Sequence, residues 1–134
     1  MGSGYEEIQH TADWALHVWA QDLTGLMQQA ALGMNALMGV RLTPNGRLEH
    51  TFKVAAGDAE SLLVAFLNAV VYEMELDSVG FDTFELKLDG LQLQARLEGA
   101  PLLELQKNIK AVTFHNLEIR SLDCGLETTI VFDV

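Results

Sequence analysis

Apolar residues recur at three- and four-residue intervals across the middle of this chain, and this spacing constrains the fold more than any other feature. The stripe consists of Leu62, Leu63, Phe66, Leu67, Val70, Val71 and Met74. Such spacing places the side chains on one face of an α-helix. Asp58 can accept main-chain N–H groups at its start, and Glu60 suits the positive end of the helix dipole. We therefore expect a long amphipathic helix that begins after Asp58.

A second stripe with the same period precedes the first. Its residues are Leu23, Leu26, Met27, Ala30, Met34, Leu37 and Met38. Asp22 is a candidate N-cap, and Gly39 is a natural stop because glycine readily adopts the left-handed conformation that ends many helices. The methionines could form an adaptable binding surface, but at this spacing core packing is the preferred interpretation.

The remaining segments alternate apolar and polar residues, which is typical of β-strands. They are residues 5–9, 14–20, 48–56, 81–89, 91–97, 109–114, 117–120 and 126–134. Asp89-Gly90 predicts a two-residue hairpin, and Asp123-Cys124-Gly125 predicts a second. Gly99-Ala100-Pro101 is expected to break the chain. Two long helices among hairpin-connected strands predict an α+β fold, in which a mixed or antiparallel sheet packs with the helices.

The length of 134 residues suits one compact domain. We assign residues 5–134 to it and interpret residues 1–4 as an expression remnant without fold information. Cys124 is the one cysteine, so an intramolecular disulfide and a cysteine zinc site are both excluded, which suits a reducing compartment. We find no signal peptide and no apolar run long enough to span a bilayer. The expectation is a cytoplasmic protein without membrane contact.

The formal net charge of −11 comes from 19 acidic and 8 basic residues. Proteins that bind nucleic acid ordinarily present a basic patch to the phosphates. The sequence contains no basic cluster, so we do not expect strong direct binding to nucleic acid. An acidic surface is compatible with solubility alone, with a metal cation or with a basic protein partner, and the sign of the charge does not choose among them.

Familiar catalytic signatures are missing from the sequence, including a phosphate-binding glycine loop, a G-x-S-x-G elbow and an H-E-x-x-H pair. His10 and Asp13 lie three residues apart in a polar connection, where they could converge on a cation or a substrate. From the residues alone, hydrogen bonding within a turn is the preferred explanation.

Two further places could carry chemistry. Lys110 stands in an apolar strand, where it could neutralise phosphate or pair with a carboxylate, although an outward-facing lysine is the default. His115 could be a ligand or a proton shuttle, or simply part of a turn. Asp133 and the final carboxylate of Val134 repel each other unless a cation or a lysine compensates, and hard cations favour such oxygen ligands. A solvated terminus explains this pair equally well.

Three segments, taken in order, resemble the archease family. They are His10-Thr11-Ala12-Asp13, residues 109–119 and Val131-Phe132-Asp133-Val134. The two expected helices agree as well, at residues 30–33, residues 58–64, Leu67-Asn68 and Tyr72. Each motif is short, but the ordered set spans nearly the whole chain. The resemblance implies an archease-like α+β fold and an accessory protein with no catalytic residues of its own.

Archeases assist RtcB-type ligases in tRNA splicing and RNA repair, so the resemblance implies such a ligase as the partner. It implies promotion of ligase guanylylation and multiple turnover. By resemblance, Asp13, Asp133 and Val134 hold a divalent metal ion, expected to be calcium, at an acidic tip. Lys110, Asp13 and Asp133 are the residues that activation is expected to require. His10 and His115 lie in matching motifs and carry less weight.

The sequence departs from the family pattern at several positions. Trp14 replaces a smaller aliphatic residue, and Ala65-Phe66 replaces an acid followed by tryptophan. Phe114 and Asn116 differ from the usual tyrosine and glycine. Leu103 falls where many members carry a histidine. The losses at Ala65 and Leu103 bear on metal affinity and on the partner contact, but not on the fold.

Two other functions are compatible with the sequence. One is a chaperone-like protein-binding module for RNA-processing or RNA-modifying enzymes. The other is a self-contained metal-dependent enzyme that uses the same carboxylates. Against the enzyme stands the lack of an obvious nucleophile or general base beside them.

Overall fold

The computed structural model describes residues 2–8, 14–114 and 117–134. Its strands are β1 (Gly4–Ile8), β2 (Trp14–Ala20), β3 (Arg41–Leu42), β4 (Leu48–Ala55), β5 (Val79–Asp89), β6 (Gln92–Glu104), β7 (Ala111–Thr113), β8 (Arg120–Leu122) and β9 (Gly125–Asp133). Its helices are α1 (Leu23–Met38) and α2 (Ala59–Asp77). The predicted α+β fold is confirmed, and all strand pairs among the described residues are antiparallel.

Both helices begin where the sequence predicts. The carboxylate of Asp22 accepts the N–H of Gly25 at 2.8 Å, and that of Asp58 accepts the N–H of Ser61 at 2.7 Å. These bonds satisfy main-chain donors that the first helical turn leaves free. Gly39 ends α1 in the left-handed conformation, with φ of 65°.

The first sheet has the order β1-β2-β9-β7, and β8 pairs with β9. Strand β1 begins at Gly4, a residue that we assigned to the remnant, and Gly4 pairs with Trp19. Strands β2 and β9 pair along their length, from Trp14 opposite Phe132 to Ala20 opposite Leu126. The predicted hairpin around Asp123-Cys124 is confirmed by the pairing of β8 with β9.

The predicted strand at residues 117–120 is wrong in its bounds, because β8 begins only at Arg120. The N–H of Leu117 donates to the carbonyl of Phe114 at 3.0 Å. The N–H of Ile119 bonds the carboxylate of Glu60 on α2, at 3.1 Å. Both N–H groups therefore have partners outside a strand ladder, and the bond to Glu60 is a tertiary contact that alternation of apolar residues cannot reveal.

The second sheet has the order β3-β6-β4, and β5 pairs with β6. The β5–β6 hairpin turns at the predicted place, with Gly90 at φ of 62°. The predicted break at residues 99–101 is wrong, since β6 continues through them to Glu104. Gly99 serves close packing instead: a Cβ there would collide with the main-chain oxygen of Gly80 on β5.

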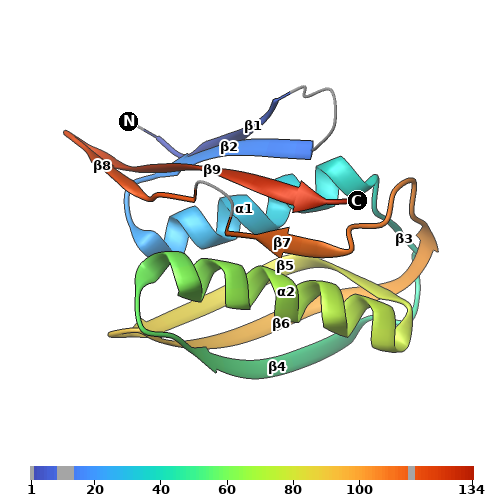
Figure 1. The fold of residues 1–134 in the computed structure, drawn as a ribbon. Helices are drawn as coiled ribbons and strands as arrows, with labels where there is room; N and C mark the ends of the chain where they lie inside the picture. The colour runs from blue at the N-terminus through green and yellow to red at the C-terminus, as the bar shows by residue number, and fades with distance from the viewer. Residues whose placement is uncertain (1, 9–13, 115–116) are drawn as a thin grey trace.

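The two helices lie between the two sheets (Figure 1). Helix α1 contacts β1 and β2 of the first sheet and β5 of the second, whereas α2 contacts β7 of the first sheet and β4 and β5 of the second. The fully buried side chains come from both layers of strands and both helices, and include Leu16, Met34, Phe66, Leu93 and Phe132. One core thus joins all three layers. No helix in the described residues has the length and apolarity that crossing a membrane requires.

Candidate functional site at the end of the first sheet

Asp133 is the last residue of β9, and the strand's alternation sets its exposure. Ile130 and Phe132 point into the core and are fully buried. Asp133, next in the alternation, is exposed, and Val134 is half-buried against the core. The strand therefore presents one carboxylate to solvent at its end, while the flanking apolar side chains fix the backbone in place.

Lys110 lies directly beside Asp133. Its main-chain N–H donates a hydrogen bond of 2.8 Å to the main-chain oxygen of Asp133, and Ala111 pairs with Asp133 in the sheet. Ile109 and Val112 on either side are buried, at 1% and 4% exposure, whereas Lys110 is exposed. Buried neighbours thus hold the backbone of Lys110 while its side chain projects into solvent.

Asn68 of α2 holds β7 against the helix layer. Its side-chain carbonyl accepts the N–H of Val112 at 2.9 Å, and its side-chain amide donates to the carbonyl of Val112 at 3.3 Å. A strand at a sheet edge leaves such main-chain groups unpaired on its outer side. The Asn68 side chain satisfies them and fixes the segment that carries Lys110.

Trp14 begins β2 at the same end of the sheet. It pairs with Phe132, the residue before Asp133. The ammonium of Lys107 lies 3.8 Å from the centroid of the Trp14 ring, close enough for a cation–π interaction. Lys107 is not predictable from the sequence, because nothing in a polar loop indicates that its side chain reaches a tryptophan in a strand far away in the sequence.

Three predicted site residues, His10, Asp13 and His115, lie outside the described residues. Of the others, the structure brings Lys110, Asp133 and Val134 together at one end of the first sheet. Figure 1 shows this end, where the C terminus follows β9 beside the beginning of β7. We call this group the strand-end site.

The charged side chains of the strand-end site differ from the four arginines of the chain. Within the part of the chain that is described, neither Lys110 nor Asp133 takes part in a side-chain ion pair. By contrast, carboxylates lie within 4.0 Å of Arg41, Arg47, Arg96 and Arg120. An exposed ammonium and an exposed carboxylate on adjacent strands are therefore free to meet a ligand or a partner.

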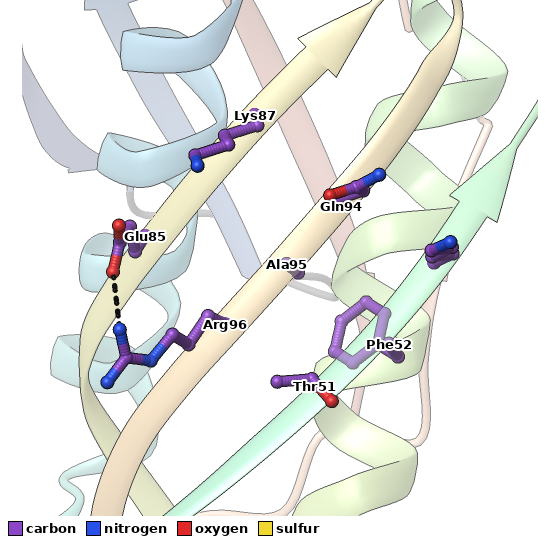
Figure 2. Close-up of a pocket in the computed structure, with 8 residues that line it drawn as sticks. Thr51, Phe52, Glu85, Lys87, Gln94, Ala95 and Arg96 are labelled. Atoms are coloured by element: carbon purple, nitrogen blue, oxygen red, sulfur yellow. Dashed lines mark hydrogen bonds and ion pairs between the residues drawn. The ribbon is translucent and has the colours of Figure 1, made fainter.

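The outer face of the second sheet carries a shallow hollow of about 460 Å³ over β4, β6 and β5 (Figure 2). Lys53, Gln94 and Lys87 form one row across these strands, and Arg96 lies in the next row. Arg96 is bound by Glu49 at 3.0 Å and by Glu85 at 3.4 Å. The described lining contains no histidine, cysteine or serine, so it offers none of these as nucleophile or general base.

The sequence model of the Archease protein family matches residues 5–134 of the chain. A protein archease from Methanopyrus kandleri is 29% identical over 127 residues, which cover 89% of this chain and 91% of that protein. A protein archease from Methanosarcina mazei is 28% identical, with 99% of this chain and 97% of that protein covered. The similarity therefore extends over nearly the whole length of this chain and of each relative.

Solved structures agree with these relatives. The solution structure of Methanobacterium thermoautotrophicum protein 1598 superposes with a TM-score of 0.76 at 25% identity, covering 98% of this chain and 99% of that one. The crystal structure of a Thermotoga maritima archease, described as a possible chaperone, gives a TM-score of 0.73 at 22% identity and 96% coverage of each chain. This second likeness supports the fold alone.

Proposed function

Because the chain belongs to the archease family, we propose that it is a non-catalytic accessory protein that activates an RtcB-type RNA ligase. The proposal includes promotion of ligase guanylylation and of multiple turnover in tRNA splicing or RNA repair. Its support is the ordered set of motifs along the chain together with the full-length family match. The family carries an accessory, chaperone-like role, and the identity of the ligase and the step it accelerates are our inference.

The observation that carries the proposal is the proximity of Lys110 to Asp133 at the end of the first sheet. Two residues that the family resemblance assigns to activation are held side by side by a main-chain hydrogen bond of 2.8 Å. Trp14, the residue after Asp13, pairs with Phe132, the residue before Asp133. An exposed lysine beside an exposed carboxylate suits a surface that engages the phosphates or the metal centre of another enzyme.

The donor set at the strand-end site fits a hard divalent cation. Asp133 offers carboxylate oxygens, Val134 offers backbone oxygens, and Asp13 adds a carboxylate by family resemblance. Calcium favours an all-oxygen ligand set. Asp133 is exposed and has no ion-pair partner among the described residues, so its carboxylate is available. The ion would supply positive charge that neutralises the clustered carboxylates, and Lys110 would steady nucleotide phosphates or tune these carboxylates.

Charge complementarity supports a basic protein as the partner. A ligase that binds RNA must present positive charge to phosphates, and the net charge of this chain is −11. Complementary charge raises the rate of encounter and orients the two proteins. The same charge disfavours strong direct binding of RNA by this chain.

A chaperone-like protein-binding module is the second candidate, and one feature favours it. Tyr72 and Leu76 are each 61% exposed on α2, one helical turn apart on the same face. Every charged residue of α2 is acidic, namely Glu60, Glu73, Glu75 and Asp77. An apolar pair with acidic neighbours suits a partner surface that is apolar and basic.

RNA ligation separates the two functions. An RtcB-type ligase from the source organism is mixed with excess RNA, with the ligase limiting, and the product per ligase is measured with and without this protein. Activation predicts a rise from about one turnover to many. Suppression of ligase aggregation without any change in turnover or guanylylation would favour the chaperone-like module. Turnover of RNA or nucleotide by this chain alone would instead indicate a self-contained enzyme.

A further inference from the structure

A second group of metal-ligating side chains lies outside the strand-end site, between β4 and α2. The Nδ1 of His50 is 2.9 Å from a carboxylate oxygen of Glu73, and its Nε2 is 3.6 Å from a carboxylate oxygen of Asp77. One ligand atom from each of the three residues falls within 4.8 Å of the others. In the described parts of the chain, no other three His, Cys, Asp or Glu residues gather in this way.

The fold holds these residues together through regular secondary structure. Glu73 and Asp77 are four residues apart on α2, so they share one face of the helix. His50 lies on the half-buried face of β4, and its imidazole packs edge-to-face with the Phe81 ring, with the centroids 5.4 Å apart. The imidazole is only 20% exposed. Its direction toward α2 is therefore set by packing.

The charges of the group are unbalanced. Two carboxylates face a single imidazole, and among the described residues no lysine or arginine forms an ion pair with Glu73 or Asp77. A neutral imidazole leaves the group with two negative charges, and a protonated one leaves it with one. A divalent cation would neutralise both carboxylates while using the imidazole as a nitrogen ligand.

We propose that His50, Glu73 and Asp77 bind a first-row divalent metal ion, with Zn²⁺ the best match. One imidazole nitrogen with two carboxylates suits zinc, whereas calcium prefers oxygen alone. Zinc bonds of about 2.0–2.2 Å in a tetrahedral shell place the ligand atoms roughly 3.4 Å apart, so the wider separations in the group, up to 4.8 Å, must shrink. Asp77 can make most of this movement, because half of its side chain is exposed. Water completes the coordination on that exposed side, where a further ligand can displace it.

The bound ion would cross-link β4 of the second sheet to α2 of the helix layer. Metal that binds the native state but not the unfolded chain stabilises the fold. The site thus differs from the strand-end site in its elements, its donor atoms and its metal. The zinc-site proposal does not depend on the proposal that the chain activates a ligase.

The test is isothermal titration of the tag-free, metal-free full chain with Zn²⁺, and with Co²⁺ as a spectroscopic probe. We expect one Zn²⁺ per chain in the low-micromolar range or tighter, and visible Co²⁺ absorption bands at the same stoichiometry. His50→Gln, Glu73→Gln and Asp77→Asn should each weaken binding by about tenfold or more. His17→Gln is the matched control: His17 bonds Glu127 at 3.1 Å but belongs to no three-residue group among the described side chains.

Three results would overturn the site. They are failure of the wild-type protein to bind Zn²⁺ at tens of micromolar, binding that all three variants retain, and binding that His17→Gln abolishes equally. If a variant does not fold, NMR of the wild-type protein still tests which residues bind zinc. Zinc should shift the ring signals of His50 and the amides of Glu73 and Asp77, and signals confined to other residues would contradict the proposal. A calcium titration that leaves His50 unchanged separates this site from the strand-end site.

Discussion

The main-chain N–H of Lys110 donates to the main-chain oxygen of Asp133 at 2.8 Å, and this bond joins the residue before β7 to the last residue of β9. Because neither side chain takes part in the bond, a substitution at either residue leaves it in place. The fold and the chemistry of the strand-end site can therefore be tested separately.

Replacing Lys110 with alanine should abolish activation of the ligase while leaving stability nearly unchanged. The side chain is exposed and forms no ion pair in the described structure, so its loss should alter the free energy of unfolding by no more than about 0.5 kcal/mol. Ligation turnover and chemical denaturation are the two measurements. Lys53→Ala, another exposed strand lysine but on the second sheet, is the control and should activate normally. Full activity of the Lys110 variant would remove this residue from the mechanism.

Asp133→Asn should reduce calcium-dependent stabilisation and abolish activation. Calcium that binds the folded protein raises its melting temperature, and the loss of one carboxylate ligand should reduce that rise. The measurement is thermal unfolding with calcium or with a chelator. Asp89→Asn removes the same charge from an exposed position at the end of β5 and should keep the response. Equal calcium responses in both variants would exclude Asp133 as a ligand.

Asn68→Ala should loosen the segment that carries Lys110. The substitution removes both hydrogen bonds between this side chain and Val112, and should destabilise the protein by about 1–3 kcal/mol. Hydrogen exchange of the Val112 amide should accelerate more than exchange in β2 or β4. Asn108→Ala, in the exposed loop before Ile109, serves as the comparison and should change exchange little. Unchanged protection at Val112 would show that Asn68 does not hold β7.

Gly99→Ala should be among the most damaging small substitutions. The added Cβ would collide with the main-chain oxygen of Gly80, so β5 and β6 must separate locally. Forced expansion of this kind costs about 1–3 kcal/mol. Gly57→Ala is the matched control, since a Cβ there meets no atom within 4 Å. Denaturation midpoints of the two variants measure the difference, and similar midpoints would contradict the packing described for Gly99.

The pair formed by Arg47 and Asp82 should contribute a pH-dependent increment of stability. The two side chains form parallel hydrogen bonds of 2.8 and 2.9 Å, and the bond from Arg47 lowers the pKa of Asp82 below its ordinary value. A carboxyl with a lowered folded-state pKa stabilises the protein above its unfolded-state pKa of about 4. This contribution disappears as pH falls through the lower folded-state value.

Denaturation midpoints at neutral pH and at about pH 3 test this dependence. Asp82→Asn should be less stable than the wild-type protein at neutral pH, and the gap should narrow at the acidic value. The gap should stay small throughout, because both side chains are about half exposed and salt screens them. A difference in stability between Asp82→Asn and the wild-type protein that grows as pH falls would contradict the lowered pKa of Asp82.

The sequence predicted the helices well because their signals are local. Asp22, Asp58 and Gly39 act within one turn of the residues they cap, so their effect can be read without tertiary context. The hairpin at Gly90 was predictable for the same reason. The division of the strands between two sheets was not, because alternation indicates a strand but not its neighbours.

The misread segments depend on distant partners. Gly99 and Pro101 are expected to interrupt a strand, yet β6 continues through both. Because Gly99 has no side chain, the backbone of β5 can lie close to it. Residues 117–120 alternate as in a strand, but the carboxylate of Glu60 on α2 binds the N–H of Ile119. Likewise, the spacing of Glu73 and Asp77 places them on one helix face, but only the fold brings His50 of β4 to them.

The most direct test of the central claim is guanylylation of the purified ligase under conditions in which it stalls after one turnover. The covalent ligase–nucleotide adduct is measured over time with no addition, with the wild-type protein, and with Lys110→Ala or Asp133→Asn. The account predicts that the wild-type protein restores adduct formation and that neither variant does, although both remain folded. Adduct formation that is unchanged by the wild-type protein, or restored equally by both variants, would contradict it.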